Sequence, residues 1–355
     1  MNAWQELKAI VVDATGTELT AEERALFAAE KPAGFILFKR NCVSKQQVSD
    51  LVASVREAVG RDDLPVLIDQ EGGTVARLRA PEFREYPAAK IFGELAQNAA
   101  EQGIDATRMS AYLMALDLAD MGITVNCAPV VDVPAPDCHE FLSASRTFSD
   151  SPDMVGQLGE AVCRGLLAGQ VTPVIKHIPG HGRARVDSHF GLPVVEVTAD
   201  ILSRTDFKPF KYLAQTNMKT ALWAMAAHVV YSSLDSDSAA TVSARVTRDV
   251  IRGEIGFDGV LIADDISMKA LGGTIEDRVA RTMGAGMDLT MICNASFEDR
   301  VKALSATPKV SAEAAQRLAE AERQRTAFTA SGNDNGAREA LHEKLAALLQ
   351  QRKTG

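Results

Sequence analysis

The sequence lacks the features that mark a secreted or membrane-spanning protein. Its five cysteines are odd in number and scattered along 355 residues with no closely spaced pair, so we expect reduced thiols and no disulfide framework. The N-terminal residues show no basic segment followed by an apolar core, and no apolar run approaches the roughly 20 residues of a membrane helix. These absences lead us to expect a cytoplasmic protein.

Positive charge is also scarce. The chain carries 38 lysines and arginines against 47 acidic residues, which gives a formal net charge of -9. Nucleic acids and anionic membranes bind basic faces, so we expect neither as a partner. The hydrophobic content of 46% is nevertheless enough for a substantial core. The sequence leaves the oligomeric state open between a monomer and a weak homo-oligomer.

What the chain does contain is a regular alternation of apolar segments and amphipathic stretches. Strands are predicted at 8–12, 34–38, 65–69, 123–129, 171–176, 220–230, 259–264 and 287–293. Helices are predicted at 20–29, 44–59, 106–121, 154–169, 207–215, 246–255 and 277–284. Eight strands separated by helices pair in parallel, and their number favours an α/β fold of the (β/α)8 TIM-barrel type over an open sheet.

The domain organisation follows from where this alternation stops. We predict one (β/α)8 catalytic domain over residues 1–328. Residues 329–355 then form a polar linker and a C-terminal helix, expected at 337–352, which packs on or near the barrel.

Polar residues collect where the predicted strands end, at Asp69, Asp132, Lys176, His177, His228, Asp264 and Asp265. A (β/α)8 barrel carries its catalytic groups at this C-terminal face. Because neighbouring strand residues point to opposite faces, only one of Asp264 and Asp265 is expected to face the barrel axis. Asp265 precedes a stretch at 266–271 that we expect to be a helix with Asp265 as its cap, so Asp264 is the candidate inward carboxylate. The same alternation separates Lys176 from His177, unless an irregular strand end turns both inward.

The most unusual stretch of the chain follows the fifth predicted strand. Residues 176–189 contain three of the six histidines, two arginines, a lysine and an aspartate, interrupted by Pro179, Gly180 and Gly182. Proline and glycine break regular structure, so we expect a loop held at the end of a buried strand. Such loops carry the working groups of α/β scaffolds.

These residues also carry a resemblance to a known family. Residues 176–182 read Lys-His-Ile-Pro-Gly-His-Gly, residues 187–189 read Asp-Ser-His, and residues 263–268 read Ala-Asp-Asp-Ile-Ser-Met. With further matches in the same order at 68–78, 128–133, 145–149 and 227–229, the chain resembles the family 3 glycoside hydrolases over roughly residues 8 to 300. Within that family it is similar to the bacterial β-N-acetylglucosaminidases of cell-wall recycling.

The resemblance implies a role for each matching residue. Asp264 would be the nucleophile of a retaining glycosidase, and His189, partnered by Asp187, would be the general acid and base. A histidine fits that role because it titrates near neutral pH, and a neighbouring carboxylate orients its ring. The positions that match sugar-binding residues are Asp69, Arg77, Arg146, Lys176, His177 and His228. His181 would mainly set the conformation of its loop.

The sequence departs from the family pattern at three positions: Ala263 replaces a common serine, Ile178 a common phenylalanine and Ala226 a common threonine. None of these changes removes a proposed catalytic group. They bear on fine positioning and substrate preference.

The function implied is a retaining exo-β-N-acetylglucosaminidase that needs no cofactor or metal. Its partner would be a small saccharide or muropeptide, with terminal N-acetylglucosamine β-linked to an anhydro-muramic sugar. A phosphorylase of the same family stays open, because a neutral histidine would not repel an incoming phosphate as a carboxylate would. A β-glucosidase and a non-catalytic sugar-binding protein are further alternatives. A metal-dependent barrel hydrolase is disfavoured, because Lys176 lies beside His177 and no His-x-His follows an early strand.

Overall fold

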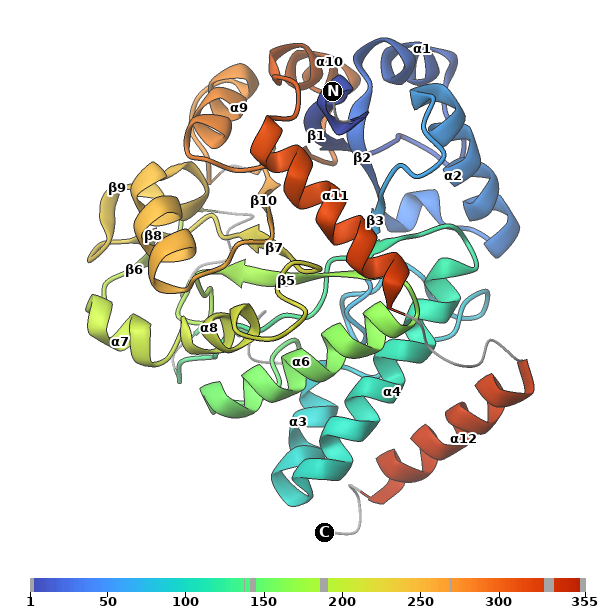
Figure 1. The fold of residues 1–355 in the computed structure, drawn as a ribbon, viewed down its shortest axis with the longest axis vertical. Coiled ribbons are helices and arrows are strands. Elements are labelled where there is room, and N and C mark those ends of the chain that lie inside the picture. Colours follow the sequence, from blue (N-terminus) through green and yellow to red (C-terminus); the bar gives the residue numbers. More distant parts are fainter. Residues whose placement is uncertain are drawn as a thin grey trace.

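Eight parallel strands close into a barrel at the centre of the protein, with helices around it (Figure 1). This computed structural model describes residues 3–136, 138–140, 145–185, 191–268, 270–328 and 335–351. The strand order around the barrel is β1-β11-β10-β7-β5-β4-β3-β2, and β1 pairs in parallel with both β11 and β2. The predicted (β/α)8 fold is confirmed.

The barrel strands are short and lie inside or close to the eight predicted segments. They are β1 (Lys8–Val12), β2 (Pro32–Leu37), β3 (Val66–Ile68), β4 (Val125–Asn126), β5 (Thr172–Ile178), β7 (Trp223–Ala226), β10 (Val260–Asp265) and β11 (Leu289–Ile292). Every residue of β2, β3, β4, β5, β7 and β11 is buried. A parallel barrel covers both faces of its sheet, which explains why these segments read as continuous apolar runs.

The helices of the described chain surround the barrel. They are α1 (Ala21–Glu30), α2 (Lys45–Val59), α3 (Ala89–Asn98), α4 (Ala100–Ala119), α6 (Pro152–Ala168), α7 (Ala199–Arg204), α8 (Lys208–Ala214), α9 (Ile275–Gly284), α10 (Phe297–Ala306), α11 (Ala312–Ala327) and α12 (Asn335–Gln351). A π-helical segment at Val246–Glu254 occupies the predicted helix before β10. The capping box predicted from Thr20 and Glu23 is present at α1, where each side chain accepts the backbone N–H of the other at 3.1 Å.

Two sequence-based expectations are wrong in detail. The strand predicted at 220–230 ends at Ala226, and Val230–Tyr231 (β8) instead joins a small separate sheet with β6 (Val194–Val195) and β9 (Asp235–Ala239). Residues 266–268 form a turn rather than the first turn of a helix. The turn is closed by the side chain of Asp265, which accepts the backbone N–H of Ser267 at 2.9 Å.

The C-terminal helix α12 lies outside the barrel, beside α4 (Figure 1). Its Leu345 is buried, and Arg338 forms an ion pair with Asp120 at 2.6 Å. Within the described residues, no helix combines the length and the apolar character that a membrane crossing requires.

Candidate active site

A pocket of about 470 Å³ opens at the C-terminal ends of the barrel strands. Its lining includes seven of the nine residues predicted to be catalytic or sugar-binding: Asp69, Arg77, Arg146, Lys176, His177, His228 and Asp264. These residues come from positions as far apart as 69 and 264, and parallel strands bring them together because all their carboxyl ends meet at one face. The remaining two, Asp187 and His189, lie outside the described residues, so their placement stays a prediction.

One side of the pocket is a network of ion pairs, which we call the ion-pair wall and define as Asp69, Glu71, Arg77, Arg146 and Lys176. The Lys176 Nζ lies 2.9 Å from Asp69 Oδ1 and 2.8 Å from Glu71 Oε1. Arg77 donates to Asp69 Oδ2 at 2.8 Å. Arg146 holds Glu71 with two parallel hydrogen bonds, at 2.6 and 2.8 Å. This fork geometry fixes both side chains in direction as well as in distance.

The ion-pair wall is charged at neutral pH. Burial alone would raise the pKa of the Asp69 carboxyl, but the Lys176 and Arg77 cations hold that pKa well below its usual range. Burial also opposes ionisation of Glu71, yet Arg146 and Lys176 lower its pKa to about 2. The two carboxylates in turn raise the pKa of Lys176 despite its burial. The wall therefore presents fixed charges with defined directions, which suits recognition of sugar hydroxyls.

Glu71 was not singled out from the sequence, although it completes this wall. It follows β3 within the glycine-rich stretch Gln70-Glu71-Gly72-Gly73, where a carboxylate looks like part of a turn. Its role depends on Arg146, which lies 75 residues further along the chain. The only feature of the sequence that could have predicted a role for Glu71 in the pocket is its position two residues after Asp69.

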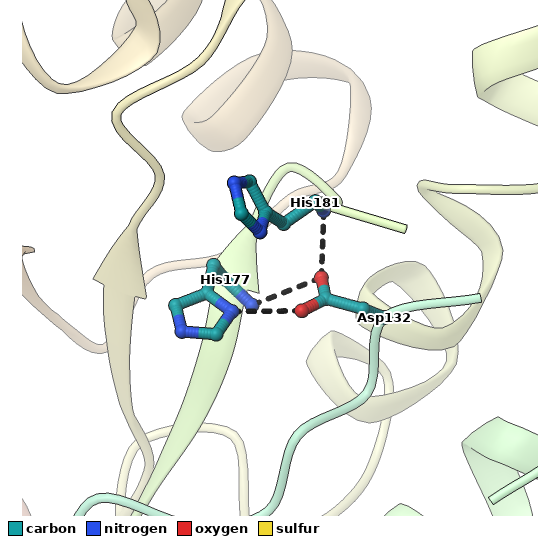
Figure 2. A group of neighbouring side chains, drawn as sticks. All are labelled: Asp132, His177 and His181. Atoms are coloured by element: carbon teal, nitrogen blue, oxygen red, sulfur yellow. Dashed lines mark hydrogen bonds and ion pairs between the residues drawn. The ribbon is translucent and has the colours of Figure 1, made fainter. Parts of the chain in front are cut away.

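A second group of buried polar residues lies beside the wall; we call Asp132, His177 and His181 the histidine cluster (Figure 2). Asp132 Oδ1 accepts the backbone N–H groups of His177 at 3.1 Å and His181 at 2.7 Å. Asp132 Oδ2 lies 2.7 Å from His177 Nδ1. One carboxylate thus ties the end of β5 and the start of the following loop to the segment after β4, and it also sets the orientation of the His177 ring.

Burial alone shifts the pKa values of Asp132 and His181 in opposite directions, because it disfavours the charged form of each group. Burial would raise the pKa of Asp132, but His177 and the other hydrogen bonds lower it to about 2. For His181, burial and the neighbouring His177 lower the pKa to about 4. Neither ring nitrogen of His181 has a hydrogen-bond partner within the described part of the chain.

Lys176 and His177 both line the pocket, although they are neighbours on one strand. The register between β5 and β7 shifts between Lys176 and Ile178, which interrupts the regular alternation of side chains. Of the two possibilities open from the sequence, the irregular strand end is the one observed. A close approach also fixes the loop that follows, since a Cβ on Gly182 would meet the carbonyl oxygen of Val133 at 1.9 Å.

Asp264 and Asp265 line the same pocket but differ in their hydrogen bonds. Asp264 accepts the backbone N–H of Asp265 at 2.8 Å. Desolvation would raise its pKa, yet His228, His177 and this hydrogen bond hold the pKa below its usual value. The side chain is therefore ionised at neutral pH, as a nucleophilic carboxylate must be.

The Asp265 carboxyl is engaged by the backbone instead. Its Oδ1 accepts the N–H groups of Ser267 at 2.9 Å and Cys293 at 3.0 Å, and Oδ2 lies 2.7 Å from Ser267 Oγ. Burial raises the pKa of Asp265 to about 7, and the charge of Asp264 adds to that rise. The neighbouring carboxyls thus have pKa values displaced in opposite directions.

His228 lines the pocket while both of its ring nitrogens are engaged within the fold. Its Nε2 lies 2.9 Å from the backbone oxygen of Asp265, so it carries the proton and donates. Its Nδ1 lies 2.8 Å from Thr241 Oγ1. With these bonds made, the ring acts on the pocket through its position beside Asp264 rather than through a nitrogen offered to a sugar.

Comparisons with known proteins agree with this geometry. The chain matches the glycosyl hydrolase family 3 N-terminal domain over residues 4–325. It is 35% identical to a beta-hexosaminidase of Stenotrophomonas maltophilia over 292 residues, which cover 82% of this chain and 84% of that protein. A beta-hexosaminidase of Nitrosomonas eutropha is 32% identical and is covered to 80%.

Solved structures show the same similarity. NagZ from Neisseria gonorrhoeae, in complex with N-trifluoroacetyl-D-glucosamine, superposes with a TM-score of 0.83 at 27% identity, covering 97% of this chain and 98% of that one. A family 3 beta-N-acetylglucosaminidase from Paenibacillus gives a TM-score of 0.81 at 25% identity, covering 98% of this chain and 69% of that one. The resemblance drawn from the sequence motifs is confirmed, and the chain belongs to glycosyl hydrolase family 3.

Proposed function

We propose that this family 3 enzyme is a retaining exo-β-N-acetylglucosaminidase, with Asp264 as its nucleophile. The observation that supports this most directly is an ionised Asp264 carboxylate in the same pocket as a wall of fixed charges. The names of the relatives, beta-hexosaminidase and beta-N-acetylglucosaminidase, point to the same reaction.

The proposed reaction has two steps. Asp264 attacks the anomeric carbon and forms a glycosyl ester, while His189 donates a proton to the departing oxygen as the glycosidic bond breaks. His189 then removes a proton from water, which attacks the anomeric carbon and releases Asp264. Asp187 would orient the His189 ring and stabilise its charged form. The roles of His189 and Asp187 rest on the sequence motif.

The ion-pair wall supports removal of one terminal sugar. We propose that Asp69, Arg77, Arg146, Lys176 and His177 contact hydroxyl groups at the non-reducing end, with His228 lining the same subsite. Charged donors and acceptors that are already held in place make strong, directional hydrogen bonds with hydroxyls.

The substrate we propose is N-acetylglucosamine β-linked to an anhydro-muramic sugar, with or without its peptide. Such fragments arise when the cell wall is recycled, and a cytoplasmic enzyme would meet them after import. All five cysteines are free thiols, which is typical of a reducing compartment.

The experiment compares nitrophenol release from the β-N-acetylglucosaminide and from the β-glucoside by wild type, Asp264→Asn and the exposed control Asp62→Asn. We expect turnover of the first substrate to fall roughly 10³-fold or more in Asp264→Asn and to be unchanged in Asp62→Asn. Folded wild type that turns over neither substrate would contradict the proposal.

Two further arms separate the alternatives within the family. Faster turnover of the glucoside would identify a β-glucosidase. Formation of sugar-1-phosphate in phosphate buffer would identify a phosphorylase, because phosphate would then replace water in the second step.

A further inference from the structure

The C-terminal helix α12 has no part in the proposed reaction. None of its described residues lines the sugar pocket, and the match to the family domain ends at residue 325, before this helix begins. The helix nevertheless packs on the barrel domain beside α4 (Figure 1), where Leu345 is 5% exposed and Arg338 pairs with Asp120. It also contacts the segment that leads from β3 to α3, and that contact gives α12 a route to the pocket.

The contact is made at Tyr86, which is only 6% exposed although it lies in a stretch without helix or strand. The Tyr86 ring lies beside the His342 ring of α12, with the two centroids 6.5 Å apart. The Tyr86 hydroxyl donates to Asp117 Oδ2 of α4 at 2.6 Å. The side chain is therefore held at two points, by its ring and by its hydroxyl. A nearby ion pair between Arg84 and Glu339 is exposed and contributes little.

The backbone at Tyr86 supports the turn that follows Glu71. The Gly73 N–H donates to the Tyr86 carbonyl oxygen at 2.9 Å. Gly72 and Gly73 have positive φ angles of 94° and 59°, and a Cβ on Gly72 would meet the Pro87 carbonyl oxygen at 2.3 Å. The glycine turn thus rests directly on this backbone, and a displacement of Tyr86 would displace the turn.

We propose that Tyr86 is a positioning residue for sugar binding, and that α12 acts on the sugar site through it. The contacts lead from His342 of α12 to Tyr86 and then to Gly73, two residues after Glu71. Glu71 in turn holds two cations of the ion-pair wall, at 2.6 and 2.8 Å. The inference rests on the sugar-binding role proposed above for this wall.

The expected effect is on binding rather than on chemistry. Asp264 lies on β10 and accepts the backbone N–H of Asp265, so a looser turn after β3 leaves the proposed nucleophile in place. A looser Glu71 would let its two cations shift, and the sugar would then meet donors that are less well directed. Weaker binding of substrate and transition state together raises KM and leaves kcat almost unchanged.

The test uses the full chain with Tyr86→Phe, which keeps the ring and removes the hydroxyl donor. Tyr212→Phe is the matched control, because the Tyr212 hydroxyl likewise donates to a carboxylate on a neighbouring helix, Glu160, outside the pocket. His342→Ala removes the α12 side of the contact, and Glu343→Ala, at an exposed position of the same helix, is its control. Thermal unfolding establishes that each variant is folded.

The first measurement is amide hydrogen exchange in peptides that cover residues 71–76. We expect exchange about 10-fold faster in Tyr86→Phe, because the Gly73 N–H opens more often when its acceptor is less well held. His342→Ala should show a smaller increase, and both controls should match wild type. This readout uses no sugar, so a folded wild type without turnover would contradict the proposed function and leave the exchange result standing.

The second measurement is the kinetics of nitrophenol release from the β-N-acetylglucosaminide. We expect KM to rise about 3–10-fold in Tyr86→Phe while kcat stays within about twofold of wild type. Unchanged exchange in both variants would overturn the proposal. Faster exchange with an unchanged KM, or a fall in kcat alone, would overturn it as well, since the turn would then move without affecting sugar binding. If Tyr86→Phe does not fold, His342→Ala decides by the same two readouts.

Discussion

The ion-pair wall and the histidine cluster lie side by side in one pocket but satisfy their polar groups differently. In the wall, Asp69 and Glu71 are each bonded to two cationic side chains. In the cluster, Asp132 is saturated by hydrogen bonds, whereas the His181 ring has no partner within the described chain. The carboxylates of the wall are thus paired with cations without substrate, whereas both ring nitrogens of His181 are left without a hydrogen bond in the described part of the protein.

This difference suggests that the ion-pair wall and the histidine cluster have different roles in the enzyme. In the wall, Asp69, Glu71 and Lys176 each have two oppositely charged partners. Side chains held in this way are rigid, and rigidity favours recognition of one sugar in one pose. The cluster instead anchors the loop that runs towards Asp187 and His189. The wall should therefore govern stability and binding, and the cluster should govern turnover.

The largest effect is expected when the wall is broken at Lys176. In Lys176→Met the aliphatic stem is kept, but Asp69 and Glu71 lose their shared cation while they stay buried. Removing one partner of a buried ion pair costs about 3–5 kcal/mol, so the free energy of unfolding in urea should fall by that amount. Activity should be lost as well.

The control for this variant is Lys208→Met, which removes an ion pair between Lys208 and Asp153 on the surface. Surface pairs contribute less than about 1 kcal/mol, so its stability should hardly change. Equal losses in the two lysine variants would show that the wall is not the stabilising network described here.

A smaller effect, mainly on turnover, is expected for Asp132→Asn. The amide oxygen can still accept the two backbone N–H groups, but the amide nitrogen then faces His177 Nδ1. His177 Nδ1 must then accept a hydrogen bond from the amide, so the proton of the ring moves to Nε2. The other ring nitrogen of His177 thereby changes from an acceptor to a donor. We expect kcat/KM to fall about 10–100-fold.

The matched control is Asp288→Asn, a buried carboxylate that is paired with Arg252 and Arg317 away from the pocket. It should lose stability and keep kcat/KM. If Asp132→Asn lost stability alone, its carboxylate would be structural and would have no part in orienting His177 or the loop.

The barrel fold could be predicted from the sequence, because a buried parallel strand requires a continuous run of apolar residues, such as Ala9 to Val12 or Val66 to Ile68. The small sheet of β6, β8 and β9 was not predicted, because it lacks such apolar runs. Its strand β9 reads Asp-Ser-Asp-Ser-Ala, residues with little preference for strands, and it forms only through pairing with β8.

The site was predictable only in part. Asp69, Lys176 and Asp264 could be placed in one pocket, because strand ends of a barrel meet at one face. The partnership of Glu71 with Arg146 could not, since it depends on how the loops after the neighbouring strands β3 and β4 pack together. The opposite pKa displacements of Asp264 and Asp265 likewise depend on neighbours that are distant in sequence, such as His228 and Cys293.

An effect on the pH dependence of stability alone is expected at Asp265, which sharpens the comparison with Asp132. Each carboxyl accepts two backbone N–H groups and faces one side chain, yet the pKa of Asp132 is lowered to about 2 and that of Asp265 is raised to about 7. Burial acts to raise both pKa values. The histidines that face Asp132 outweigh this rise, whereas the hydrogen bonds to Asp265 do not, and the charge of Asp264 adds to it. A protonated Asp265 also fits its network, because Oδ2–H can donate to Ser267 Oγ, which then donates to the Cys293 carbonyl oxygen, 2.9 Å away.

An asparagine at position 265 makes the same hydrogen bonds with its amide nitrogen in place of Oδ2–H. The folded protein with Asp265 binds a proton that the unfolded chain releases near its ordinary pKa of 3.8, so wild type loses stability as the pH rises from about 4 to about 7. Asp265→Asn should lack this loss and gain roughly 2 kcal/mol relative to wild type between pH 5 and pH 8. Urea unfolding at the two pH values measures the difference, and a stability gap that does not change with pH would mean that Asp265 is ionised in the folded enzyme throughout this range.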